Sequence, residues 1–237
     1  MRFVFLTLEN AVKDGSLHDC YPDFVKKKIN LEEGNYTIIT FNYETLLERA
    51  LLNCSLSGNF SYGLDVDANR IEHFPSYERN FDESLLILKL HGSLNWAECQ
   101  NCNKNQLFWF NQYDHIFKEK CNKCDKNLTP ILIPPTKSKY LKEPLANLWK
   151  IAEDKIIRAD EITIIGYSFN DYDVTALSLI LDSIKQNKQH LTLNIIDSDP
   201  HNIRNKIFSL ASIDENDFKE IHLFKGFRNY LKEISIQ

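Results

Sequence analysis

Four cysteines with the spacing of a metal site are the residues that most directly predict chemistry. They form two Cys-x2-Cys pairs separated by 18 residues, namely Cys99, Cys102, Cys121 and Cys124. A two-residue gap lets both thiolates of a pair face one ion, and the segment between the pairs can fold back as a hairpin. Four thiolates complete the tetrahedron that zinc prefers, which leaves no position for water. The spacing therefore predicts a structural zinc ribbon at residues 97–128. Four ordinary buried or disulfide-bonded cysteines would not explain both gaps and the spacer together.

A second group of polar residues stands at the ends of apolar runs. Asn42, His91, Ser168 and Asp197 each fall at or just past such a run. Open parallel sheets bind ligands along the edge formed by the carboxyl ends of their strands. Three of them also have a simpler explanation: Asn42 as a helix cap, Asp197 together with Asp199 as caps of a helix that follows Pro200, and His91 as a turn residue before Gly92. Four such residues on one edge favour a ligand site.

The apolar runs predict the elements that would carry these residues. Strands are expected at 36–41, 85–90, 161–165, 191–196 and 221–224, and helices at 44–52, 145–159, 171–184 and from 227 onward. The prolines of 130–135 suggest an extended segment at a sheet margin. Near-continuous apolar strands that alternate with helices predict an α/β fold with a doubly wound parallel sheet. The economical organisation is one domain over 1–237, with the zinc ribbon as an insert.

Composition limits the classes of function. The chain has 237 residues, 43% of them hydrophobic and 26% charged, and a net charge of -5. This acidic balance gives no electrostatic reason to expect nucleic acid as a partner. No apolar stretch is long enough to cross a membrane, and Glu9 interrupts the apolar start too early for a signal peptide. We therefore expect a cytoplasmic protein, in which thiols stay reduced and available to metal.

Four motifs, in their order along the chain, resemble the sirtuin family. They are Thr40-Phe41-Asn42-Tyr43-Glu44, Leu90-His91-Gly92-Ser93, the double cysteine pair, and Gly166-Tyr167-Ser168-Phe169. The likeness is greater to the bacterial sirtuin-like branch, in which a T-x-N-Y-D-x-L-L-E segment is typical and which includes NAD-consuming domains of antiphage defence systems. It covers residues from about 36 to about 200. The resemblance implies a Rossmann-like domain that binds NAD, with the zinc ribbon packed beside it.

The same resemblance implies a catalytic pair. The chemistry of the family breaks the bond between nicotinamide and the anomeric carbon of the ribose, through an oxocarbenium-like transition state that the enzyme must stabilise and orient. By resemblance, Asn42 would orient the ribose and a water at the anomeric carbon. His91 would contact the ribose hydroxyls and act as the general base, a task for which imidazole is suited near pH 7.

The remaining roles that the resemblance implies concern binding. Gly166 and Ser168 would lie against the phosphates or the ribose, because small residues allow close approach of the backbone. Asp197 would accept hydrogen bonds from the adenosine ribose, as acidic residues at such strand ends do. The expected cofactor-binding set is Thr40, Asn42, Glu44, Gly166, Ser168 and Asp197. The four cysteines would hold zinc away from the reaction centre.

Two departures from the family pattern concern the NAD site. The family opens with a strand and a glycine-rich G-A-G-x-S loop that cradles the pyrophosphate. The only glycines before Gly58 are Gly15 and Gly34, so we expect the N-terminal glycine-rich strand-loop, and with it the central strand, to be lacking. Glu44 stands where the family usually has aspartate, and the extra methylene could shift the carboxylate by about 1 Å.

A third departure bears on the acceptor. Deacylating sirtuins carry an F-G-E segment beside the acyl-lysine groove, whereas this chain has Ile133-Pro134-Pro135-Thr136. Prolines cannot donate hydrogen bonds to an incoming peptide strand. Three functions stay open: an NAD glycohydrolase, an NAD-dependent deacylase that takes an acyl-lysine peptide, and a non-catalytic remnant or interaction module. The first is favoured, and the sequence leaves homo-oligomer formation open.

Overall fold

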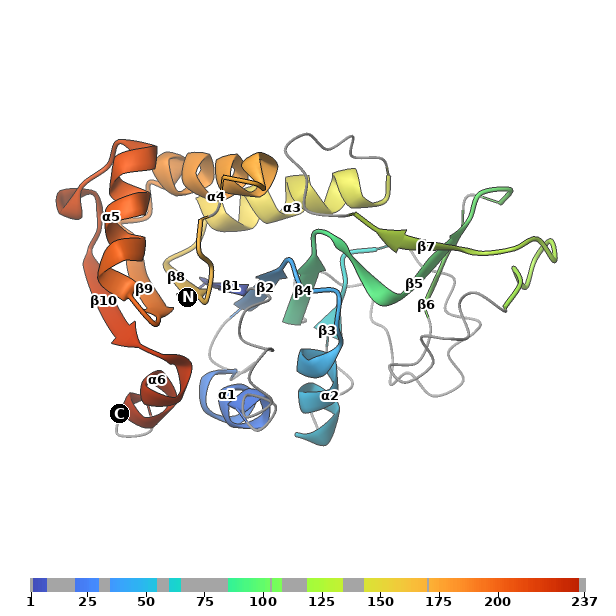
Figure 1. The fold of residues 1–237 in the computed structure, drawn as a ribbon, viewed down its shortest axis with the longest axis horizontal. Helices are drawn as coiled ribbons and strands as arrows, with labels where there is room; N and C mark the ends of the chain where they lie inside the picture. Colours follow the sequence, from blue (N-terminus) through green and yellow to red (C-terminus); the bar gives the residue numbers. More distant parts are fainter. Residues whose placement is uncertain are drawn as a thin grey trace.

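The apolar runs form the strands of one parallel sheet (Figure 1). In this computed structural model the described residues are 2–7, 20–29, 35–54, 60–64, 85–102, 104–107, 119–133, 143–169 and 171–234. The sheet contains β1 (Arg2–Thr7), β2 (Asn35–Thr40), β3 (Phe60–Ser61), β4 (Leu85–Lys89), β8 (Glu161–Ile165), β9 (Thr192–Asp197) and β10 (Glu220–Lys225). Their order is β10-β9-β8-β1-β2-β4-β3. The chain thus builds the sheet outward in both directions from β1, which confirms the predicted doubly wound α/β fold.

Helices cover both faces of this sheet (Figure 1). One face carries α1 (Cys20–Lys28), α2 (Leu46–Asn53) and α6 (Phe227–Glu233), and the other carries α3 (Leu145–Ile157), α4 (Val174–Gln186) and α5 (Pro200–Ala211). A short 3-10 helix, η5 (Glu215–Asp217), precedes β10. Because the central strands are covered on both sides, Ile38, Ile87 and Ile162 are fully buried. This explains why these strands could be predicted from near-continuous apolar runs.

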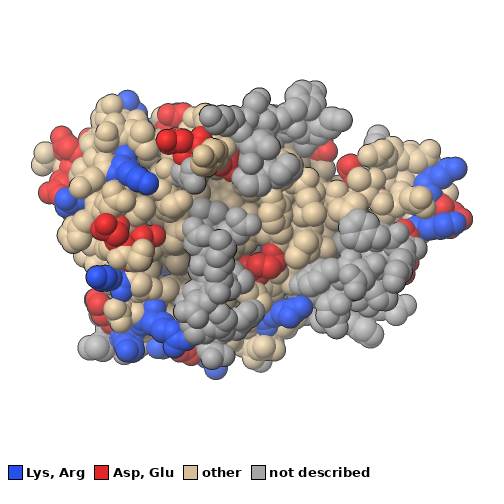
Figure 2. Space-filling model, viewed as in Figure 1, with Lys and Arg blue, Asp and Glu red and all other residues tan. Residues whose placement is uncertain are grey.

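The predicted boundaries agree with the observed ones to within a few residues. Helix α2 begins at Leu46 rather than at 44, and α4 begins at Val174 rather than at 171. The prediction gave no bounds for α5, and it missed β1, α1 and the two-residue strand β3. Within the part of the chain that the structure describes, no helix is both long and apolar enough to span a bilayer. Basic and acidic side chains are interspersed on the face shown in Figure 2.

A strand does occupy the centre of the sheet. β1 pairs in parallel with β2 on one side and with β8 on the other, and Thr7 stands opposite both Thr40 and Ile165. The expectation that the central strand would be lacking is therefore wrong for this structure. Residues 8–19, which follow β1 where the glycine-rich loop of the family would stand, lie outside the described residues. Thr7, the last described residue before them, ends β1 at the same edge of the sheet as Asn42 and Gly166.

A smaller antiparallel sheet projects from the end of β4. It consists of β5 (Gly92–Cys99), β6 (Lys104–Leu107) and β7 (Thr129–Leu132) in the order β6-β5-β7. The smaller sheet therefore extends beyond the predicted range 97–128 on both sides, from Gly92 to Leu132. β7 is an edge strand, as the prolines of 130–135 suggested, whereas Pro134 and Pro135 lie outside the described residues.

The two sheets join at Gly92. This residue has a φ of +84°, and a Cβ placed on it would lie 1.9 Å from the carbonyl oxygen of Ile131 in β7. Only glycine tolerates both the left-handed conformation and this close approach. The backbone N–H of Ile133 donates to the carbonyl oxygen of His91 at 2.8 Å. The residue before the junction, His91, is thereby tied to the smaller sheet.

Candidate functional site

The predicted polar residues lie along the carboxyl edge of the large sheet. Asn42 comes two residues after the end of β2, and His91 comes two residues after the end of β4. Since Thr40 pairs with Lys89, these two positions stand at the same level on neighbouring strands. Gly166 follows β8, and Asp197 is the last residue of β9. The switch point, where open sheets bind ligands, falls between β1 and β8, within this edge.

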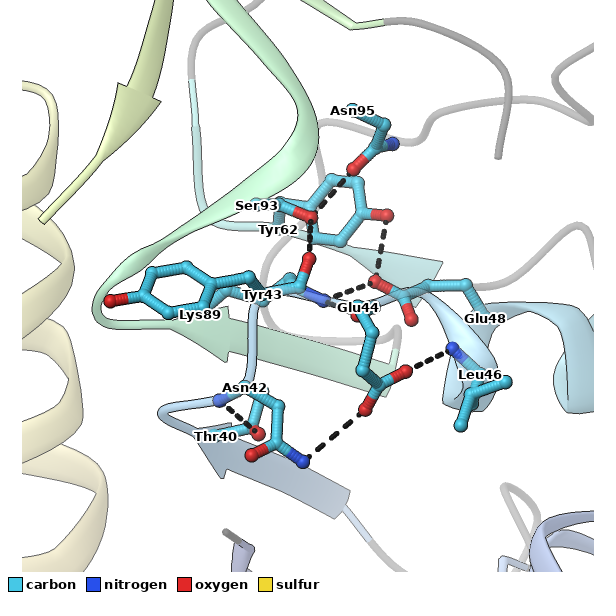
Figure 3. Close-up of polar contacts among 10 residues, drawn as sticks. All are labelled: Thr40, Asn42, Tyr43, Glu44, Leu46, Glu48, Tyr62, Lys89, Ser93 and Asn95. Atoms are coloured by element: carbon cyan, nitrogen blue, oxygen red, sulfur yellow. Dashed lines mark hydrogen bonds and ion pairs between the residues drawn. The ribbon is translucent and has the colours of Figure 1, made fainter. Parts of the chain in front are cut away.

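Asn42 is buried and only partly satisfied (Figure 3). Its backbone N–H donates to Oγ1 of Thr40 at 3.1 Å, and its side-chain Nδ2 donates to Oε1 of Glu44 at 3.2 Å. Its Oδ1 has no hydrogen-bond partner among the described residues, although the side chain is only 2% exposed. A buried carbonyl in that condition costs about 1–3 kcal/mol, which a ligand donor or a water would recover.

The simpler explanation of Asn42 as a helix cap is wrong. Thr45 is the N-cap of α2, and it makes no capping hydrogen bond through its side chain. The N–H of Leu46 instead donates to Oε2 of Glu44. The longer glutamate side chain can therefore contact both the helix start and Asn42. Burial raises the pKa of Glu44, while the nearby ammonium of Lys89 acts in the opposite direction.

A buried ion pair lies beside the loop that carries Asn42 and Glu44 (Figure 3). Nζ of Lys89 lies 3.1 Å from Oε1 of Glu48, and both side chains are almost fully buried. The hydroxyl of Tyr62 donates to the same carboxylate oxygen at 3.1 Å. Lys89 also donates to the backbone carbonyl of Glu44. Sequence reasoning missed this ion pair, although a lysine inside the apolar run 85–90 was a signal that could have revealed it.

His91 is enclosed by rings and by a carboxylate. Its ring centroid lies 5.0 Å from that of Phe41 and 6.3 Å from that of Trp149. Its Nε2 lies 2.9 Å from Oδ2 of Asp173, and His91 is only 4% exposed. Oδ1 of Asp173 accepts a hydrogen bond from the N–H of Ala176, which makes Asp173 the N-cap of α4. The sequence did not predict this residue, because an acidic residue before a helix is explained by capping alone.

The β8 and β9 ends supply the rest of the edge. Gly166 has a φ of +64°, and its N–H donates to the carbonyl oxygen of Ile196 at 2.9 Å. The carbonyl oxygen of Ser168 accepts from Nζ of Lys206 at 3.0 Å, beside a groove of about 630 Å³. Oδ1 of Asp197 accepts from the N–H of Asp199 at 3.0 Å.

The helix cap expected at this end of the sheet is Asp199. Its side chain accepts a hydrogen bond from the N–H of Asn202, at the start of α5. Asp197 is not the cap, because its carboxylate bonds to the turn that precedes the helix. The carboxylate of Asp197 therefore stands at the strand end, where the sequence predicted a ligand contact.

The cysteine quartet fits a zinc ion. The four sulfur atoms of Cys99, Cys102, Cys121 and Cys124 all lie within 4.8 Å of one another. A tetrahedral site with Zn–S bonds of about 2.3 Å places its sulfurs about 3.8 Å apart. The backbone N–H of Lys123 lowers the pKa of Cys121 to about 6, which favours the thiolate that binds metal. The donor set and its geometry are thus compatible with structural zinc.

A comparison with protein families identifies the chain. The model described as a SIR2-like domain matches residues 36–215. The chain belongs to the SIR2-like family. The match begins within β2 and ends in η5, so it contains all the predicted polar residues and the four cysteines. Membership in this family implies an NAD-binding domain. A search of curated proteins found no match.

Solved Sir2 structures share the fold of this SIR2-like domain. A Sir2 homologue mutant in complex with 2'-O-acetyl ADP ribose has a TM-score of 0.50 at 16% identity, over 98% of this chain and 90% of that one. Sir2Tm bound to a propionylated peptide has a TM-score of 0.47 at 15% identity, over 99% and 92%. A structure that addresses the mechanism and regulation of Sir2 enzymes has a TM-score of 0.46 at 16% identity, over 96% and 67%.

Proposed function

We propose that this SIR2-like domain binds NAD and hydrolyses it to nicotinamide and ADP-ribose. The observation that carries the proposal is the buried Oδ1 of Asn42, which has no hydrogen-bond partner among the described residues and lies two residues past β2, level with His91 two residues past β4. An acceptor kept dry and without a partner is suited to hold a ribose hydroxyl or the attacking water. Family membership supplies the class of ligand.

The two residues would divide the reaction between them. The glycosidic bond breaks with its electron pair passing to nicotinamide, while the oxygen of a water bonds to the anomeric carbon. In our proposal Asn42 orients that water and the ribose, and His91 receives the proton that the water loses. The phenyl ring of Phe41, 5.0 Å from the imidazole, helps to exclude bulk water and so strengthens both interactions.

The other half of the edge would bind the adenosine diphosphate part. Gly166 adopts a positive φ at the switch point, and among the described residues no atom lies within 4 Å of a Cβ placed at this position. We propose that a phosphate or ribose lies against this side of the Gly166 backbone. In this proposal Ser168 also contacts that group, and the carboxylate of Asp197 accepts the adenosine ribose hydroxyls. Zinc at the cysteine quartet would hold the smaller sheet in shape.

Deacylation is the second candidate. It requires an acyl-lysine peptide as a co-substrate, and in sirtuins that peptide pairs with the segment after the ribbon. Here that segment contains Pro134 and Pro135, which carry no N–H for a peptide strand to bond. Water is therefore the acceptor that we favour. The bacterial resemblance further suggests a cytoplasmic defence effector, which would deplete cellular NAD during phage infection.

The decisive assay incubates zinc-loaded protein with NAD, with and without an acetyl-lysine peptide, and separates the products by chromatography. Nicotinamide and ADP-ribose should form without peptide, and Asn42→Ala and His91→Ala should each abolish this. Asn229→Ala and His222→Ala, at exposed positions in α6 and β10, are the matched controls. Turnover only with peptide would replace hydrolysis by deacylation. No nicotinamide release and no thermal shift with NAD, from folded protein, would leave the non-catalytic module.

A further inference from the structure

Asp173 is a side chain to which the family resemblance gives no role, and it contacts the expected general base. Its Oδ2 lies 2.9 Å from Nε2 of His91, and its side chain is 14% exposed. Its second oxygen accepts the N–H of Ala176 at 3.1 Å. The N-cap of α4 and the imidazole therefore share one carboxylate, with one oxygen for each.

This division decides where His91 carries its proton. An ionised carboxylate only accepts hydrogen bonds, so the Nε2 that faces Oδ2 must be the protonated nitrogen. In the neutral ring the lone pair then resides on Nδ1. The hydroxyl of Tyr167 also lies near Asp173: burial raises the pKa of Tyr167, and the carboxylate adds to this effect. Tyr167 thus stays neutral and adds no competing charge.

The ring itself has little freedom to turn. Phe41 and Trp149 pack against it and against each other, and the indole Nε1 of Trp149 donates to the carbonyl oxygen of Leu90 at 2.9 Å. The backbone carbonyl of His91 accepts a hydrogen bond from the N–H of Ile133, the residue directly after β7. These contacts and the burial of His91 restrict the orientation of the imidazole, so the position of its proton depends on the group that faces each ring nitrogen.

We propose that Asp173 is a positioning residue that fixes His91 in the Nε2–H tautomer and so leaves Nδ1 as the basic atom. The proposal rests on the hydrolytic role of His91 proposed above. Asp173 touches no reacting atom in this scheme, and it acts only through the imidazole. An equivalent carboxylate behind a catalytic histidine is known to matter for this reason in serine proteases.

The test uses Asp173→Asn, which separates the two tasks of the carboxylate. Asparagine caps helices as well as aspartate does, so its Oδ1 can still accept the hydrogen bond from the N–H of Ala176. The amide nitrogen then faces Nε2 as a donor, and the neutral ring must move its proton to Nδ1. Asp214→Asn, the same change at the exposed N-cap of η5, is the matched control.

The effect of Asp173→Asn is measured on the tautomer of His91 and on the kinetics of NAD hydrolysis. Nitrogen-15 NMR of histidine-labelled protein, with the His91 signals assigned by their loss in His91→Ala, should show the Nε2–H form in the native chain and the Nδ1–H form in Asp173→Asn. NAD hydrolysis should lose about 100-fold or more in kcat, the usual contribution of a general base, while KM stays nearly unchanged. Asp214→Asn should alter neither.

Each result has one meaning. A native chain with neutral His91 in the Nδ1–H form overturns the inference without any variant, even if no NAD is consumed. Native turnover with full kcat in folded Asp173→Asn also overturns it, and leaves the proposed hydrolysis intact. A rise in kcat would instead make Asp173 an inhibitory contact. Should Asp173→Asn fail to fold, Asp173→Ser keeps a helix cap without the carboxylate, and the same loss in kcat is expected.

Discussion

Replacement of Gly92 by alanine tests the junction between the two sheets. The added Cβ would stand 1.9 Å from the carbonyl oxygen of Ile131 and 2.8 Å from its carbonyl carbon. Both atoms belong to the backbone of β7, so no side chain can turn aside. Carbon and oxygen atoms normally keep about 3.3 Å apart, which means that β7 must move by more than about 1 Å.

The magnitude follows from two contributions. A left-handed conformation costs an L-residue about 1–2 kcal/mol. Displacement of β7 also weakens the bond from the N–H of Ile133 to His91 and the bond from the hydroxyl of Tyr43 to the carbonyl of Ile133, at about 1 kcal/mol each. We expect Gly92→Ala to lose about 3–4 kcal/mol of unfolding free energy.

The control is Gly226→Ala. Gly226 has a similar φ of +86°, but a Cβ there meets nothing within 4 Å. It should cost only the conformational term, about 1–2 kcal/mol. Urea denaturation of both variants with zinc bound gives the comparison. Equal losses in the two proteins would refute the close approach of β7 to Gly92. Because His91 is bonded to the displaced segment, NAD turnover should also fall in Gly92→Ala and persist in Gly226→Ala.

Three further predictions concern the metal, the buried ion pair and pH. Elemental analysis should find about one zinc per chain, and Cys121→Ser should lose most of it; a full complement in that variant would show that the quartet is not the site. Lys89→Met should lower the free energy of unfolding, measured by urea denaturation, by about 3–5 kcal/mol, because it leaves the Glu48 carboxylate buried without its cation. The double variant Lys89→Met/Glu48→Leu should recover much of this loss, and an equal loss in the single and the double variant would contradict the argument. The pKa of Glu44 is raised by burial above 4.5, so folding binds its proton more tightly, and its contribution to stability is present at low pH and declines as pH rises through the folded pKa. The stability of the native chain relative to Glu44→Gln should therefore fall between about pH 4 and pH 7, and a constant difference across that range would argue against a buried, desolvated carboxyl.

Much of the large sheet could be predicted because strands that are buried on both faces consist of near-continuous apolar residues, a pattern visible in the local sequence. β2, β4, β8 and β9 are near-continuous apolar runs, and each was expected within a residue or two of its observed bounds. The cysteine quartet could be predicted for a different reason, since ligand spacing is itself a local constraint. β1 was not predicted as a strand, because the short apolar start of the chain has no period or flanking turn that distinguishes it from other apolar segments.

The candidate site likewise contains residues that could be predicted from local sequence and one that could not. Asn42, His91 and Asp197 were found from their places at the ends of strands, since parallel strands bring their carboxyl ends to one edge whatever the details of packing. The partner of His91 was not found. Asp173 has a sufficient local explanation as a helix cap, and nothing in its neighbourhood in the sequence refers to residue 91.

The sequence by itself determined the α/β class, the cysteine quartet with the spacing of a metal site and the edge of the sheet at which chemistry is expected, because hydrophobic periodicity and ligand spacing are properties of short segments. Only the tertiary structure decided that β1 lies at the centre, that Lys89 and Glu48 support the loop of Asn42, and that Asp173 holds His91. These are contacts between segments far apart in the chain. They depend on how helices and strands pack, and no local pattern encodes which two side chains will meet.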